Sequence, residues 1–108
     1  MKPFQLAREA ARELDEAAAR YEEKQPGLAD RFLNELEEVI AYVRRHPSAS
    51  PKVRGIPPEL GIRQRSFSRF PYLLIFMDLG TEVRGLAVCH VRRRPGYWLR
   101  RVPPLPKQ

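Results

Sequence analysis

The pair Pro26–Gly27 separates two segments in which apolar residues recur every three or four positions. That spacing is the period of an amphipathic α-helix, and the first segment is also rich in alanine, the best helix former. Proline cannot continue a helix, and glycine accepts the left-handed geometry that ends one. Two helices joined by so short a turn lie antiparallel, so the sequence predicts a helical hairpin. The apolar positions are Leu6, Ala10, Leu14, Ala17, Ala18 and Tyr21, then Leu28, Phe32, Leu36, Val39, Ile40 and Val43.

Charged side chains fill the positions between the apolar ones. On the first helix they include Glu9 and Glu13, which we expect on a solvated face. On the second helix, Arg44 and Arg45 fall in the last turn, where cations suit the negative end of the helix dipole, and Pro47 ends the helix.

The rest of the chain is typical of a sheet. Residues 47–61 hold four prolines and two glycines and predict a loop, whereas residues 62–67, 72–77 and 83–91 predict strands. Phe4–Leu6 is a candidate for a further short strand. The expected architecture is therefore α+β, with an N-terminal antiparallel helical hairpin packed on an antiparallel sheet of three or four strands. A chain of 108 residues has room for one such domain, residues 1–108.

Alternation within the strands predicts which side chains share a face. In the first strand of the sheet, Arg63 and Arg65 should lie on the side opposite Ile62. In the last strand, Val88 and His90 should share a face, together with Leu86.

The two parts of the chain differ sharply in charge. Residues 1–45 carry 8 basic and 10 acidic side chains, net −2, whereas residues 46–108 carry 12 basic and 3 acidic ones, net +9. Such asymmetry favours a surface that faces a polyanion or an acidic partner. The alternative is that the positive charge reflects only a general bias of the composition toward arginine, which outnumbers lysine 16 to 4.

Several classes of protein do not fit this sequence. The longest apolar run has six residues, against the roughly 20 that a membrane helix needs, and no secretory leader opens the chain. One cysteine allows no internal disulfide, and the two histidines fall in different predicted elements. We therefore expect a cytoplasmic protein with no membrane association, no metal site and no cofactor.

The densest polar cluster is residues 90–101, which follow the last predicted strand. An arginine guanidinium can donate two parallel hydrogen bonds to phosphate oxygens, and aromatic rings can stack on unpaired bases. The alternatives are that the two aromatic rings close the core, and that the arginines are solvated or pair with the acidic helices. The residues predicted to bind nucleic acid or a partner are Arg65, Arg69, Arg93, Arg94, Trp98, Arg100 and Arg101.

A metal-independent endoribonuclease is one chemistry that the same region suggests. It requires a base for the 2′-hydroxyl, cations for the phosphorane and an acid for the leaving oxygen. His90 fits the base or the acid, Arg63 and Arg92 fit the cations, and Tyr97 fits the proton donor. The alternative for His90 is a strand-end histidine that hydrogen-bonds to the backbone and orders the next turn.

Short motifs, each present once, follow one another in a fixed order along nearly the whole chain. With these motifs the chain resembles the RelE/ParE superfamily of bacterial type II toxins, and most closely its ParE-like branch. The motifs are Ala19–Glu23, Pro26–Ala29, Asp30–Leu33, His46–Pro47, Ile62–Arg63, Phe70–Tyr72, Leu86–His90, Arg92–Arg93, Pro95, Tyr97–Trp98 and Arg101.

The resemblance implies a toxin that a cognate antitoxin holds inactive, often through an acidic tail, with a homodimer or a heterotetramer with antitoxin as possible assemblies. ParE proteins poison DNA gyrase, whereas RelE proteins cut mRNA on the ribosome. RelE-type nucleases place lysines around the phosphate, but the lysines here, Lys2, Lys24, Lys52 and Lys107, fall at the termini, a helix end or a loop. Gyrase binding is therefore favoured, with a ribosome-dependent endoribonuclease or a non-toxic basic binding module as alternatives.

Overall fold

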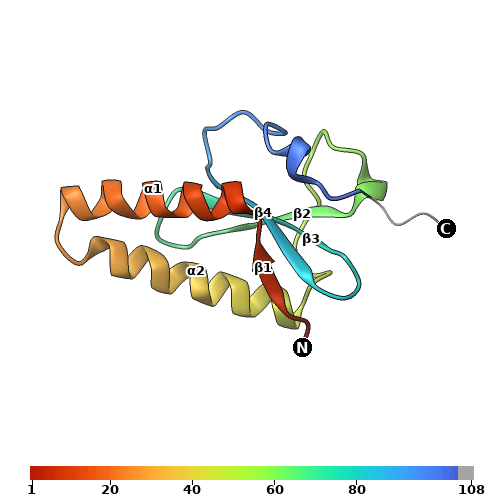
Figure 1. The fold of residues 1–108 in the computed structure, drawn as a ribbon, viewed down its shortest axis with the longest axis horizontal. Coiled ribbons are helices and arrows are strands. Elements are labelled where there is room, and N and C mark those ends of the chain that lie inside the picture. The colour runs from red at the N-terminus through yellow and green to blue at the C-terminus, as the bar shows by residue number, and fades with distance from the viewer. Residues whose placement is uncertain (105–108) are drawn as a thin grey trace.

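The computed structural model describes residues 1–104, which fold as two helices against one four-stranded sheet (Figure 1). The predicted α+β class and the N-terminal helical hairpin are confirmed. Lys107 and the end of the predicted domain lie outside the described residues. The elements in chain order are β1 (Phe4–Leu6), α1 (Arg8–Lys24), α2 (Leu28–Arg45), a 3-10 turn (Pro58–Leu60), β2 (Ile62–Ser66), β3 (Tyr72–Asp78), β4 (Val83–His90) and a 3-10 turn (Leu99–Arg101).

The turn between the helices forms as predicted. Gly27 has a φ of +89°, a left-handed geometry that glycine adopts without strain. The carboxylate of Glu22, near the end of α1, accepts hydrogen bonds from the backbone N–H groups of Gly27 and Ala29 at 3.1 Å. It thereby caps the start of α2, whose first N–H groups have no partner within the helix. Figure 1 shows the two helices side by side along the long axis of the molecule.

The helices cover one face of the sheet with a continuous apolar core. Phe32 is fully buried at its centre, with its ring 5.0 Å from that of Tyr72 and 5.3 Å from that of Phe67. Leu74 and Phe76 of β3 are also fully buried against the helices. The alternate residues of the central strand therefore face the hairpin, as the period of two requires.

The opposite face is covered by two irregular segments, residues 47–61 and 91–102. Val53 and Trp98 pack from these segments against Ile75 of β3. The first segment is also tied to the edge of β2, because Val53 N–H donates to the carbonyl of Ile62 at 3.0 Å. We call this side the loop-covered face and the other the helix-covered face.

The sheet is mixed, which corrects the predicted all-antiparallel sheet. The strand order is β1-β4-β3-β2, and β1 runs parallel to β4, with Phe4 opposite Val83 and Leu6 opposite Gly85. Parallel neighbours need a long crossover, which α1, α2, β2 and β3 together supply. Gly85 allows the pairing, because a Cβ there would lie 2.6 Å from Leu6 Cδ2. The three residues of β1 are too few to contain a sequence pattern that specifies whether the strand runs parallel or antiparallel to its neighbour.

A β-bulge in β4 corrects the predicted faces of that strand. Phe76 pairs with Gly85 and Ile75 pairs with Ala87, so Leu86 is the extra residue. An extra residue in a strand shifts the in–out alternation of its side chains, so residues after the bulge face the opposite side from the one that simple alternation predicts. Leu86 therefore packs in the loop-covered face, whereas Val88 packs under the helices. The prediction for β2 is confirmed, because Ile62 lies in the loop-covered core, opposite the side of Arg63 and Arg65.

Candidate functional site

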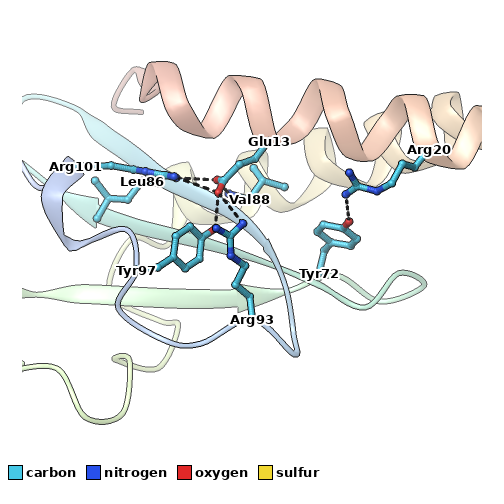
Figure 2. A network of polar contacts seen from close by, with 8 residues as sticks. All are labelled: Glu13, Arg20, Tyr72, Leu86, Val88, Arg93, Tyr97 and Arg101. Atoms are coloured by element: carbon cyan, nitrogen blue, oxygen red, sulfur yellow. Dashed lines mark hydrogen bonds and ion pairs between the residues drawn. The ribbon is translucent and has the colours of Figure 1, made fainter.

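Among residues 1–104, the side-chain group with the most hydrogen bonds is the carboxylate of Glu13 on α1 (Figure 2). Its Oε1 accepts hydrogen bonds from Arg101 Nη1 at 2.8 Å and from the Val88 N–H at 3.2 Å. Its Oε2 accepts hydrogen bonds from the Tyr97 hydroxyl and from Arg101 Nη2. Only 14 % of the Glu13 side chain is exposed. One partly buried carboxylate thus joins the first helix, the last strand and the C-terminal segment.

This network closes the part of the β4 edge that β1 leaves uncovered. β1 pairs with β4 only as far as Gly85. Beyond it, the Leu86 carbonyl accepts a hydrogen bond from Arg101 Nη1 at 3.0 Å, and the Val88 N–H donates to Glu13. An open strand edge is a template for another strand. Here two side chains satisfy two of its backbone groups instead.

Burial and the Glu13 carboxylate set the protonation of the neighbouring groups. Burial, together with the hydrogen bond to Glu13, raises the pKa of Tyr97 well above its ordinary value. Burial and then the Glu13 charge raise the pKa of Cys89 to about 11. Burial lowers the pKa of Arg101, but the hydrogen bond to Glu13 and the negative charge of that carboxylate together outweigh burial, and the net pKa is raised. Near neutral pH, the phenol and the thiol therefore keep their protons and the guanidinium keeps its charge.

Two of the predicted binding residues, Arg93 and Arg101, meet around this network. The Arg93 guanidinium lies 3.8 Å from the centroid of the Tyr97 ring and 3.9 Å from Glu13, and Arg101 lies on the same carboxylate. Trp98 is 1 % exposed and belongs to the core of the loop-covered face. The rings of Tyr97 and Trp98 are thus both engaged within the molecule, and Arg101 is paired with an acidic helix.

His90 lies on the helix-covered side at the end of β4. Its ring meets that of Tyr72 edge to face at 5.4 Å, and its Nδ1 accepts a hydrogen bond from the Arg92 N–H at 3.1 Å. The Tyr72 hydroxyl in turn accepts a hydrogen bond from Arg20 at 3.1 Å (Figure 2). The histidine therefore orders the turn after β4, and the Arg92 side chain itself is exposed.

Arg63 lies far from His90 in the sheet. Arg63 pairs with Phe76 on β3, whereas His90 pairs with Tyr72 from the other side of the same strand. Four residues of strand separate these positions, about 13 Å at 3.3 Å per residue. Arg63 Nη1 donates to the Ser50 carbonyl at 2.7 Å, which points it toward the loop before β2. The structure therefore does not bring Arg63 and His90 to one site.

The remaining predicted arginines lie in separate places. The Arg65 guanidinium stacks 3.7 Å from the ring centroid of Tyr42 on the helix-covered side. The Arg69 N–H donates to the buried carboxylate of Glu35, and its side chain lines a groove beside α2. Arg94 and Arg100 are exposed on the C-terminal segment. The arginines thus do not form one continuous surface.

A cavity of about 340 Å³ opens on the loop-covered face, between the two irregular segments. Four cationic side chains lie at its wall, and its lining includes no aspartate or glutamate. The deeper wall is apolar and includes the side of Trp98. The lining residues are Pro51, Lys52, Val53, Arg54, Gln64, Leu73, Ile75, Cys89, Val91, Arg93, Arg94, Pro95 and Trp98.

Sequence reasoning missed three of these residues. Glu13 was expected in solvent, although it lies three residues after Ala10 and four before Ala17, both fully buried. That helical spacing was a signal that Glu13 shares their face. Lys52 and Arg54 fall within the predicted loop, and no local pattern shows that this loop lies beside residues 91–95.

Two further observations concern residues 1–104. Neither helix in this range is long and apolar enough to cross a membrane. Within the same range, histidine, cysteine and acidic side chains do not gather in threes as a metal ion would require. The polar groups that do gather are a carboxylate, a phenol and guanidinium groups, which form ion pairs and hydrogen bonds rather than a metal centre.

The arrangement of a helical hairpin on one face of such a sheet matches a solved toxin–antitoxin structure. The structure titled "Chromosomal ParDE TA system from P. aeruginosa" superposes with a TM-score of 0.61 at 19 % sequence identity, over 83 % of this chain and 96 % of that chain. At this identity the similarity is one of fold.

The family assignment comes from the sequence. The family described as "ParE toxin of type II toxin-antitoxin system, parDE" matches residues 4–95. The match spans most of the chain, so this chain belongs to the ParE toxin family, and the predicted ParE-like resemblance is confirmed. No curated protein matches the chain.

Proposed function

We propose that this chain is the toxin of a type II toxin–antitoxin pair, that it inhibits growth by binding DNA gyrase, and that a cognate antitoxin neutralises it. The family match over residues 4–95 carries the proposal. Gyrase is the target that the ParE resemblance implies.

The positions of the nuclease candidates favour binding over RNA cleavage. Arg63 and His90 lie at positions about 13 Å apart along β3 and bond to different loops. The Tyr97 hydroxyl donates a hydrogen bond to Glu13, and burial and that bond raise the pKa of Tyr97. A general acid needs a proton that it can give up near the working pH. In this arrangement Tyr97 is a poor proton donor.

The charge distribution supports an acidic antitoxin segment as the neutralising partner. Residues 46–108 carry a net charge of +9, and Arg92, Arg94 and Arg100 are exposed among them. Complementary charge speeds encounter and disfavours partners of the wrong sign. We expect the toxin–antitoxin complex to assemble faster at low salt than at high salt, as stopped-flow mixing would measure.

A supercoiling assay with purified gyrase tests the target. We expect the purified chain to inhibit supercoiling and the addition of antitoxin to restore it. Normal supercoiling at an excess of toxin, with growth still arrested on induction, would overturn gyrase as the target. Light scattering on the toxin–antitoxin complex distinguishes a heterotetramer from a simple pair.

Two variants test the nuclease alternative. We expect His90→Ala and Arg63→Ala to remain toxic, and translating extracts to keep their mRNA intact. Loss of toxicity in both, with antitoxin binding retained and mRNA cut by the wild type, would favour a ribosome-dependent endoribonuclease. Harmless induction of the wild type would favour the non-toxic basic module.

A further inference from the structure

The cavity on the loop-covered face combines an apolar interior with a cationic rim. Lys52, Arg54 and Arg94 are exposed, although each lines the cavity. Arg93 also lines it, but its guanidinium is shared with the Tyr97 ring and lies 3.9 Å from Glu13. The rim therefore presents at least three cations, from two segments that are distant in sequence.

The interior of the cavity fits an aliphatic side chain better than a base. Ile75 and Val53 are buried in its wall, and Leu73 and Val91 add further aliphatic surface to the lining. Bases bind by stacking on exposed aromatic faces. Trp98 is only 1 % exposed, and Arg93 lies over the Tyr97 ring.

The size of the cavity matches a short segment rather than a large ligand. Its volume of about 340 Å³ lies at the lower end of the roughly 300–1,000 Å³ range of ligand pockets. That space holds one large apolar side chain together with the backbone that carries it. Anionic groups on either side of that side chain would then reach the rim.

We propose that this cavity binds an acidic peptide segment, with one aliphatic side chain inserted between Val53, Ile75 and Leu73 and flanking carboxylates paired with Lys52, Arg54 and Arg94. Charge complementarity and the aliphatic lining select this occupant. The inference rests on the proposed function, since the antitoxin is the source that we expect for such a peptide.

A defined peptide tests the cavity without either protein. The probe is acetyl-DELDE-amide, and Trp98, the single tryptophan of the chain, reports occupancy by its fluorescence. We expect a saturable fluorescence change that weakens with added salt. The isosteric neutral peptide acetyl-NQLNQ-amide and the serine peptide acetyl-DESDE-amide should each bind about tenfold more weakly.

Charge-reversal variants assign the binding to this rim. We expect Arg54→Glu/Arg94→Glu to weaken binding of acetyl-DELDE-amide by about tenfold or more. The matched control is Arg8→Glu/Arg12→Glu, which changes the same charge at two exposed positions of α1 and should leave binding within about twofold. Circular dichroism and the unfolding midpoint show whether each variant is folded.

Three results would overturn the inference. They are no saturable response with the wild type, equal weakening in the two double variants, and tighter binding of a short oligouridylate than of the peptide. Because the probe is synthetic, these results do not depend on gyrase or antitoxin. Peptide binding together with normal supercoiling would instead overturn the gyrase proposal and leave the cavity assignment standing.

Discussion

The sheet is covered by regular structure on one face and by irregular structure on the other. On the helix-covered face, α1 and α2 present apolar side chains at helical spacing, and Phe32 is fully buried among aromatic rings. On the loop-covered face, residues 47–61 and 91–102 hold their own core around Trp98 but leave a cavity between them. The side chains of packed helices and strands interdigitate along the length of the elements. Two loops that run over a surface contact each other only where each is fixed to the sheet.

The two faces differ in charge as well as in packing. The groove beside α2 mixes Arg31 and Arg69 with Glu35 and Glu38, whereas the cavity on the loop-covered face has no aspartate or glutamate in its lining. The loop-covered face carries the cationic rim, and Glu13 ties its C-terminal segment to α1. We infer that the helices supply most of the packing energy and that the loops supply the binding surface.

The largest expected effect is on the helix-covered core. We expect Phe32→Ala to lower the free energy of unfolding by about 3–5 kcal/mol, since it leaves a cavity among rings that cannot close it. Urea denaturation measures this change. The matched control on the other face is Leu99→Ala, which truncates a side chain that is 41 % exposed and should cost at most about 0.5 kcal/mol. Similar losses of unfolding free energy in the two variants would contradict the inference that the helix-covered face supplies most of the packing energy.

The second effect concerns the tie between the faces. We expect Glu13→Gln to cost about 1–3 kcal/mol, since Arg101 would stay largely buried without a counter-charge. Hydrogen exchange should speed up at Val88 and through residues 91–102, with α2 little changed. Glu23→Gln, an exposed position near the end of the same helix, is the control. Unchanged exchange in residues 91–102 would show that other contacts hold this segment.

The third effect is a loss of stability in alkali. The pKa of Cys89 is raised from 9.0 to about 11 in the folded chain by burial and by Glu13. The folded state thus favours the neutral thiol, and that contribution is complete below pH 9 and lost as pH rises through 11. We expect the free energy of unfolding to fall by about 2 kcal/mol over this interval. The Cys89→Ala variant should lose less stability between pH 9 and 11 than the wild type does. If the two proteins show the same dependence of unfolding free energy on pH, Cys89 is not the group responsible.

The smallest expected effect compares one cation–aromatic pair from each side. Arg65 lies 3.7 Å from the Tyr42 ring centroid beside α2, and Arg93 lies 3.8 Å from that of Tyr97 in the C-terminal segment. Double-mutant cycles with Arg→Ala and Tyr→Leu should give a coupling of about 0.5–1 kcal/mol for each pair. A coupling near zero for Arg93–Tyr97 alone would mean that the loop-covered side is less ordered than the helix-covered one.

Much of the fold could be predicted because its signals are local. Periodicity on either side of Pro26–Gly27 specified the helical hairpin, and alternation in β2 specified its two faces. The faces of β4 could not be predicted, since the bulge at Leu86 depends on its pairing with β3. Of the candidate site residues, Arg93, Tyr97 and Arg101 do meet, whereas Arg63 lies apart because strand order decides that distance.

The sequence by itself determined the two helices, the antiparallel strands, the charge asymmetry and the ParE-like motifs, because each depends on neighbours within a few residues or on composition. Only the tertiary structure decided that β1 lies parallel to β4, that Glu13 binds Arg101, and that Lys52 and Arg54 face Arg94 across a cavity. These pairs join residues tens of positions apart. Their proximity results from how the whole chain packs, and no local pattern encodes it.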